Sequence, residues 1–137
     1  MTGTQGKVMT WAGWVITVLI SLMMTASGIM KLMNPPAVAE QFVEKFGYPA
    51  DLTLYLGIVE ISCVVLYLIP PTAILGAVLL TGYLGGAIAT HVRVHDDLGC
   101  ITPAIIGVFV WLGVFLRDPR VRALLPIRRS GHDESKL

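Results

Sequence analysis

The sequence predicts an all-α membrane protein: a four-transmembrane-helix antiparallel bundle with a short amphipathic interfacial helix between spans 1 and 2. Three observations favour this fold class. Of the 137 residues, 55% are hydrophobic and only 14% are charged, whereas soluble domains usually carry about 25% charged residues. The mean hydropathy is +0.74. Four apolar segments approach the roughly 20 residues that a spanning helix needs. We therefore expect residues 1–126 to form one transmembrane domain.

The first predicted span covers residues 8–31. Its apolar run is longer than the 7–15 or so residues of a signal-peptide core, so we interpret it as a retained span. Trp11 and Trp14 lie near its start, and tryptophans gather where a helix leaves the membrane.

The other three predicted spans cover residues 52–69, 72–91 and 101–116. Pro70 and Pro71 end the second span, because proline removes a backbone donor and restricts the residue before it. The fourth span is close to the short limit for crossing a bilayer. Thr102 and Pro103 suit the start of its helix.

The segment between the first two spans has a helical apolar pattern. Val38, Phe42 and Phe46 recur four residues apart, which places them on one helix face. We expect a short amphipathic helix that lies in the membrane interface. An ordinary structured loop is the alternative.

Basic residues predict the orientation. Seven of the ten lysines and arginines lie before span 1 or after span 4, and these are Lys7, Arg117, Arg120, Arg122, Arg128, Arg129 and Lys136. The positive-inside rule then puts both termini in the cytoplasm. We expect residues 127–137 to form a polar, disordered tail. A net charge of +1 gives no electrostatic reason to expect a nucleic-acid partner.

Glu60 is the main candidate site residue. It lies in the middle of the second predicted span, where a carboxylate is costly unless another group pairs or protonates it. Counted from the start of the span, it lies roughly 13 Å deep at 1.5 Å per residue. A buried hydrogen-bond anchor is the structural alternative to a ligand, proton or redox role.

Other polar residues lie on the side from which Glu60 enters. Lys31 ends the first predicted span, and Thr90, His91 and Arg93 end the third. We predict a polar ligand-binding pocket of Lys31, Glu60, Thr90, His91 and Arg93 that opens to the non-cytoplasmic side. Taken alone, Lys31 would be a snorkelling end residue and His91 an interfacial one.

Two further patterns are weaker. Gly82 and Gly86 form a small-residue face on the third span, which we interpret chiefly as helix packing. His91 and His95 are four residues apart and would share a face if the helix continued through them. With the neighbouring Asp96 and Asp97 they make an incomplete ligand set, so we predict no metal site.

The third span also carries a recognisable sequence. It reads TAILGAVLLTGYLGGAIATHVRVHDD over residues 72–97, and Thr90-His91-x-Arg93 stands near its end. Together with SGIMKL at residues 27–32 and LRDPRVRALLP at residues 116–126, it resembles the DoxX-like family of small bacterial membrane proteins. The resemblance implies a four-span bundle in a bacterial inner membrane. One departure is the His95-Asp96-Asp97 turn after the arginine.

Three functions follow from these residues and from the resemblance. The family takes its name from a membrane subunit associated with thiosulfate:quinone oxidoreductase, which implies a quinone-binding or redox-linked subunit, and quinone is the one cofactor considered. Related animal proteins look like assembly factors, so a chaperone for other membrane proteins is the alternative. A small-anion carrier with Lys31, His91 and Arg93 at its mouth is the third and would require a homodimer. Beyond these, the lipid bilayer is the predicted partner.

Overall fold

The computed structural model describes residues 3–126, and these are helical with short connections. The helices are α1 (Thr4–Met33), α2 (Pro36–Glu40), the π-helical turn η1 (Gln41–Lys45), α3 (Leu52–Leu68), the 3₁₀ turn η2 (Pro70–Thr72), α4 (Ala73–Arg93), α5 (Asp97–Arg117) and α6 (Pro119–Leu124). The all-helical prediction is confirmed for this part of the chain. The predicted polar tail, residues 127–137, lies outside the described residues.

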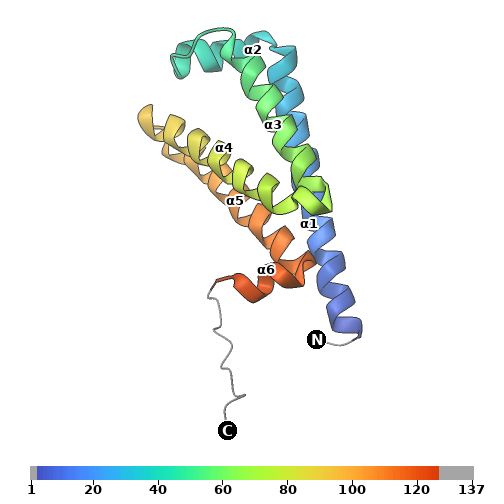
Figure 1. Ribbon diagram of the computed structural model, residues 1–137. Coiled ribbons are helices and arrows are strands. Elements are labelled where there is room, and N and C mark those ends of the chain that lie inside the picture. Colours follow the sequence, from blue (N-terminus) through green and yellow to red (C-terminus); the bar gives the residue numbers. More distant parts are fainter. Residues whose placement is uncertain (1–2, 127–137) are drawn as a thin grey trace, which may run out of the picture.

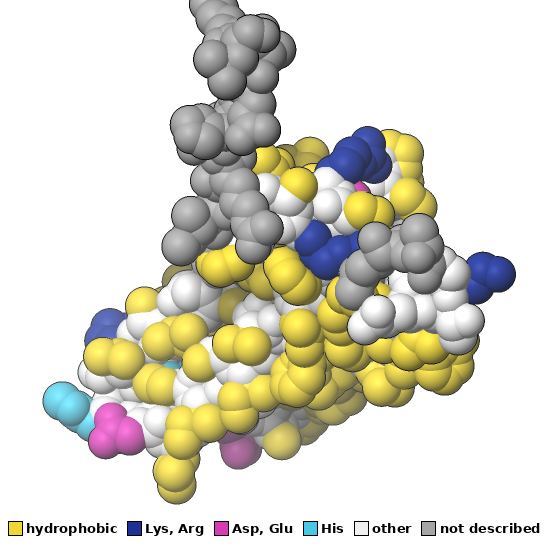
Figure 2. Space-filling model, turned by 90° about the horizontal axis from the view of Figure 1, so that it is seen from below, with side chains coloured by type: hydrophobic (Ala, Val, Ile, Leu, Met, Phe, Trp, Pro, Cys, Tyr) yellow, Lys and Arg dark blue, Asp and Glu magenta, His cyan; other side chains and the backbone are white. Residues whose placement is uncertain are grey.

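Three helical stretches are long and apolar enough to cross a membrane: Thr4–Met33, Pro70–Arg93 and Asp97–Arg117. α3 is apolar but has only 17 residues. Many large hydrophobic side chains of these helices point outward, among them Leu22, Val78 and Val108. On the face seen in Figure 2, hydrophobic side chains cover much of the surface. Such a surface suits lipid rather than water, so the protein is a membrane protein.

The fourth predicted span starts earlier than expected. α5 begins at Asp97, and Pro103 lies inside it, so the predicted start at Thr102 and Pro103 is wrong. The Asp96 carboxylate accepts a hydrogen bond from the Gly99 N–H at 3.0 Å and caps the helix there. Pro103 therefore lies in the second turn of a helix whose first turn is capped by Asp96.

The four long helices form two pairs (Figure 1). α1 packs along α3, and α4 packs along α5. The pairs meet near the end of the molecule that carries the N-terminus and α6, here called the terminal end. They diverge toward the opposite end, which carries α2, η1 and the α4–α5 turn and is here called the loop end (Figure 1).

Glycines allow the close contacts of the terminal end. A Cβ atom on Gly13 of α1 would lie 2.6 Å from the backbone nitrogen of Arg117 and 2.9 Å from the Gly113 oxygen of α5. Tyr67 of α3 is fully buried beside them, and its hydroxyl donates to the Val110 oxygen at 2.7 Å. Backbone contact of this kind fixes how α1, α3 and α5 cross.

The segment between α1 and α3 is helical, as predicted, over α2 and η1. Its apolar face turns toward the protein at Phe46, which is only 4% exposed. Phe42 packs edge-on against Phe46 with the ring centres 5.5 Å apart. The segment therefore covers the loop end of the helix pairs, where it contacts α4.

Candidate functional site

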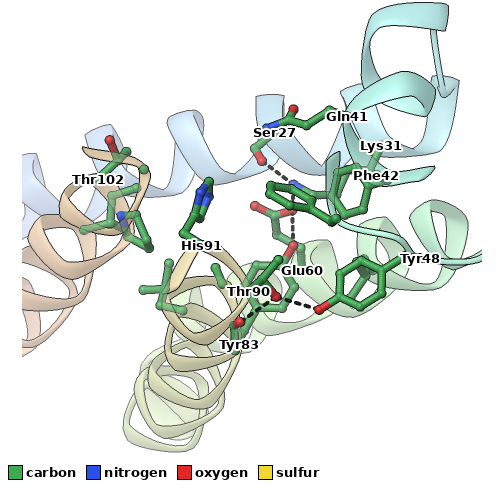
Figure 3. A pocket seen from close by; sticks show the side chains of 18 of the residues that line it. Ser27, Lys31, Gln41, Phe42, Tyr48, Glu60, Tyr83, Thr90, His91 and Thr102 are labelled. Atoms are coloured by element: carbon green, nitrogen blue, oxygen red, sulfur yellow. Dashed lines mark hydrogen bonds and ion pairs between the residues drawn. The ribbon is translucent and has the colours of Figure 1, made fainter. Parts of the chain in front are cut away.

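A cavity of about 620 Å³ lies between the two helix pairs, toward the loop end. Pockets for small ligands usually enclose about 300–1,000 Å³. Its walls are mostly apolar, with Met24, Leu56, Leu84 and Ile106 among them. The polar lining comes from few residues, and these are Ser27, Lys31, Gln41, Tyr48, Glu60, Tyr83, Thr90, His91 and Thr102 (Figure 3).

Lys31, Glu60 and Tyr83 join three helices at one wall of the cavity. The Lys31 ammonium lies 2.8 Å from Oε2 of Glu60. The Tyr83 hydroxyl donates to the same oxygen at 2.9 Å (Figure 3). Glu60 is 1% exposed, so its charge is held by an ion pair and a hydrogen bond rather than by water. We call these three residues the triad.

Local spacing explains why the lysine reaches the acid. A Cβ atom on Gly57 of α3 would lie 2.9 Å from the Gly28 oxygen of α1, so the two backbones touch one turn before Lys31 and Glu60. Ser27 lies four residues before Lys31 on the same face of α1, and its hydroxyl accepts from the ammonium at 2.6 Å. The helix contact and the serine together direct the lysine toward Glu60.

One oxygen of Glu60 remains available. Within residues 3–126, both protein hydrogen bonds to the carboxylate go to Oε2, and none goes to Oε1. Glu60 also lines the cavity. The arrangement therefore offers a buried, charged acceptor to whatever occupies that space.

The loop end is covered by contacts between the η1 region and α4. Thr90 donates its hydroxyl hydrogen to the Gly86 oxygen at 2.9 Å, so the Tyr48 hydroxyl, 2.6 Å away, must be the donor to Thr90. The Arg93 guanidinium donates to the Phe46 oxygen and stacks over the Tyr48 ring at 5.2 Å. These contacts hold the cover of the cavity to α4.

A second charged group strengthens this cover. Asp96 lies 2.6 Å from the Lys45 ammonium and 2.9 Å from Nδ1 of His91. The hydrogen bond from Lys45, followed by those from the Gly99 N–H and His91, lowers the pKa of Asp96 to about 2. The Phe46 ring packs edge-on against His91 at 5.1 Å. We call Lys45, His91 and Asp96 the latch.

The structure brings together only part of the residue set that the sequence predicted. Lys31 contacts Glu60, and Thr90 and His91 line the same cavity. His91 bonds to Asp96 instead of reaching down toward the acid. Arg93 does not line the cavity and secures its cover from outside. The expected convergence of His91 and Arg93 on Glu60 is therefore corrected, because the end of α4 turns toward the η1 region.

Tyr83 is the functional-site residue that sequence reasoning missed. It lies seven residues before Thr90, two helix turns away on the same face of α4. A tyrosine inside a span combines an apolar ring with a hydroxyl that needs a partner when buried. That combination, in register with Thr90, was the available signal.

Two other sequence interpretations change. A Cβ atom on Gly82 or Gly86 would meet nothing within 4 Å, and both glycines line the cavity; helix packing within the chain does not explain them. α4 ends at Arg93, and His95 has a φ of 56°. His91 and His95 therefore do not share a helical face.

The comparisons with known proteins agree with the sequence resemblance. Neither the curated proteins nor the solved structures gave a match. A family model described as the DoxX-like family matches residues 15–113. The matched region contains the triad, the cavity-lining glycines and the latch, and it covers well over half of the sequence. The chain belongs to the DoxX-like family.

Proposed function

We propose that the protein crosses the membrane with four helices and binds a lipophilic ligand of the quinone type in its cavity. The observation that carries the proposal is the triad at the wall of a mainly apolar cavity. Apolar walls suit a ring or a chain, and a few fixed polar groups set the orientation of its head. A redox-linked membrane subunit would use the site in this way.

The fourth crossing is assigned to α3. Its 17 residues extend about 26 Å at 1.5 Å per residue, close to the hydrocarbon thickness of about 30 Å. α3 packs against both α1 and α4. A bilayer that contains these longer helices must therefore also contain α3. The four long helices then alternate in direction, with the terminal end in the cytoplasm of a bacterial cell.

The placement of Arg93 favours a lipophilic ligand over a small anion. A carrier for anions would present free basic groups at its mouth. The Arg93 guanidinium is occupied by the Phe46 oxygen and the Tyr48 ring, and the Lys31 ammonium faces Glu60 at 2.8 Å. Both cations are thus already engaged by protein groups.

Adjacent glycines provide a matched test of ligand binding. Gly86 lines the cavity, whereas the neighbouring Gly85 does not, and a Cβ atom at either position would meet open space. Protein in lipid nanodiscs is titrated with a short-tailed probe of the quinone type, in both its quinone and its quinol form. We expect saturable binding to the wild type and to Gly85→Phe, and loss of binding in Gly86→Phe. Equal binding to all three proteins, or none to the wild type, would refute the proposed site.

Topology needs a separate experiment. Reporter fusions at Leu137 and in the loop near Lys45 should report opposite compartments, with Leu137 in the cytoplasm. The same compartment for both would contradict four crossings.

A further inference from the structure

The triad has hydrogen-bonding capacity that the protein itself does not use. The Lys31 ammonium has three N–H donors and gives two of them to Ser27 and Glu60. Tyr83 gives its only hydrogen to Glu60. Among the described residues, the triad keeps one N–H of Lys31, the acceptor lone pairs of the Tyr83 hydroxyl and the Oε1 oxygen of Glu60, of which only Oε1 is a charged acceptor. A donor and a charged acceptor are thus left next to each other at the cavity wall.

The unused acceptor decides which chemistry fits. A carboxylate oxygen that no protein group contacts is a strong acceptor left unused, and a hydrogen bond to a charged group is among the stronger ones in proteins. A ketone or quinone carbonyl can accept from Lys31, but it brings no hydrogen to Oε1. A ligand carboxylate would place a second negative charge beside Glu60. The single positive charge of Lys31 balances only the charge of Glu60.

A hydroxyl group satisfies both atoms at once. It can donate its hydrogen to Oε1 of Glu60 and accept from the Lys31 ammonium. We propose that the cavity selects ligands whose polar end is a hydroxyl, so that a quinol or a long-chain alcohol binds in preference to the matching carbonyl or ether. This inference rests on the proposed function, because it names the head group of the ligand that the cavity takes.

The rest of the cavity agrees with an apolar body below such a head. Met24, Leu56, Leu84 and Ile106 line it, and Gly82 and Gly86 leave room where side chains would stand. The Tyr48 hydroxyl is committed to Thr90 and Nδ1 of His91 to Asp96. Gln41 and Thr102 also line the cavity, but neither carries a charge. The triad is therefore the place where a hydroxyl finds both a free donor and a free charged acceptor.

The test compares matched probes on one protein. Wild-type protein in nanodiscs is titrated anaerobically with a short-tailed quinol and its quinone, and separately with a prenyl alcohol and its methyl ether. A lost hydrogen bond to a charged group corresponds to about a tenfold or larger difference in affinity. We expect the hydroxyl member to bind at least about tenfold more tightly in one or both pairs, and the pair that shows it identifies the source of the hydroxyl.

Glu60→Gln supplies the control within the site. The amide keeps the size of the side chain and can turn its NH₂ group toward the cavity, so the preference should fall and shift toward the carbonyl or ether member. Equal affinities within both pairs on the wild type would overturn the hydroxyl inference while leaving the proposed function intact. Failure of all four probes to bind would instead refute the proposed function.

Discussion

At the terminal end Gly13 brings α1 to within backbone contact of α5, whereas toward the loop end Gly82 and Gly86 of α4 face an open cavity. Each end also holds a buried charged group. The Arg117 guanidinium donates to the Tyr67 oxygen and stacks on the rings of Trp14 and Tyr67 at 4.4 and 5.0 Å, and its Nη1 has no partner among the described residues. Glu60 is paired with Lys31 and lines the cavity. Glycine thus closes one end of the helix pairs and leaves space at the other.

The difference teaches that a glycine in a spanning helix has no single meaning. At the terminal end a side chain would push helices apart, so the missing Cβ is needed for packing. Near the triad the missing Cβ atoms of Gly82 and Gly86 leave room for the cavity. The two ends therefore predict opposite responses to the same substitution, and they also predict which buried charge depends on a partner.

The largest effect is expected when the triad loses its cation. Lys31→Met strands the buried Glu60 carboxylate, and breaking a buried pair on one side typically costs about 3–5 kcal/mol. The double variant Lys31→Met with Glu60→Gln should recover much of that loss, because neither charge remains. Denaturant unfolding in detergent, arranged as a double-mutant cycle, measures the coupling. Additive losses would mean that the two side chains do not stabilise each other.

The second expected effect compares the glycines directly. Gly13→Ala should destabilise the fold by about 1–3 kcal/mol, because the new methyl group meets backbone atoms that cannot yield easily. Gly86→Ala should be neutral or should stabilise the protein by up to about 1 kcal/mol, since alanine favours the helix and nothing opposes it. Thermal unfolding of both variants provides the measurement. Similar losses at both positions would remove the distinction between the two ends.

A third effect separates stability from function at Glu60. Gln keeps an acceptor for Tyr83 and Lys31, whereas Leu leaves both without one, at about 1–3 kcal/mol for each unsatisfied group. Glu60→Gln should therefore unfold at a higher temperature than Glu60→Leu. If the leucine variant were the more stable, the acid would be retained for function at a cost in stability.

The smallest effect concerns the latch. The pKa of Asp96 is lowered to about 2 from an ordinary value near 3.9, so its contribution is present above about pH 4 and is lost as the pH falls toward 2. Amide hydrogen exchange of the segment from Pro36 to Tyr48, corrected for the intrinsic exchange rate at each pH, should show a loss of protection over that range in the wild type. In Asp96→Asn, exchange should already be faster at neutral pH and should lack this pH dependence. An unchanged profile in the variant would show that Asp96 does not hold the cover.

Much of this architecture could be predicted from residues with a strong local signal. A charged residue inside an apolar run and a lysine at the end of its neighbour are visible without a structure, and Glu60 and Lys31 do meet. The long helices follow from composition and length. The start of α5 was missed because the Asp96 cap, not Pro103, begins the helix.

The remaining features depend on geometry that no single segment encodes. Tyr83 joins the triad only because α4 packs against α3. Arg93 leaves the predicted pocket because Phe46, which follows η1, presents its backbone oxygen to it. The role of Gly82 and Gly86 depends on where the helix pairs diverge. Spacing along one helix cannot distinguish a packed glycine from one that faces a cavity.

The central claim, that the open end of the bundle holds a lipophilic molecule, is tested most directly by native mass spectrometry of protein released from its own membranes. We predict one bound molecule of defined mass on the wild type and on Gly85→Phe, and its absence from Gly86→Phe, whose side chain would occupy part of the cavity. The same bound mass on Gly86→Phe, or a wild-type protein that carries only bulk lipid in proportion to its abundance, would contradict the claim.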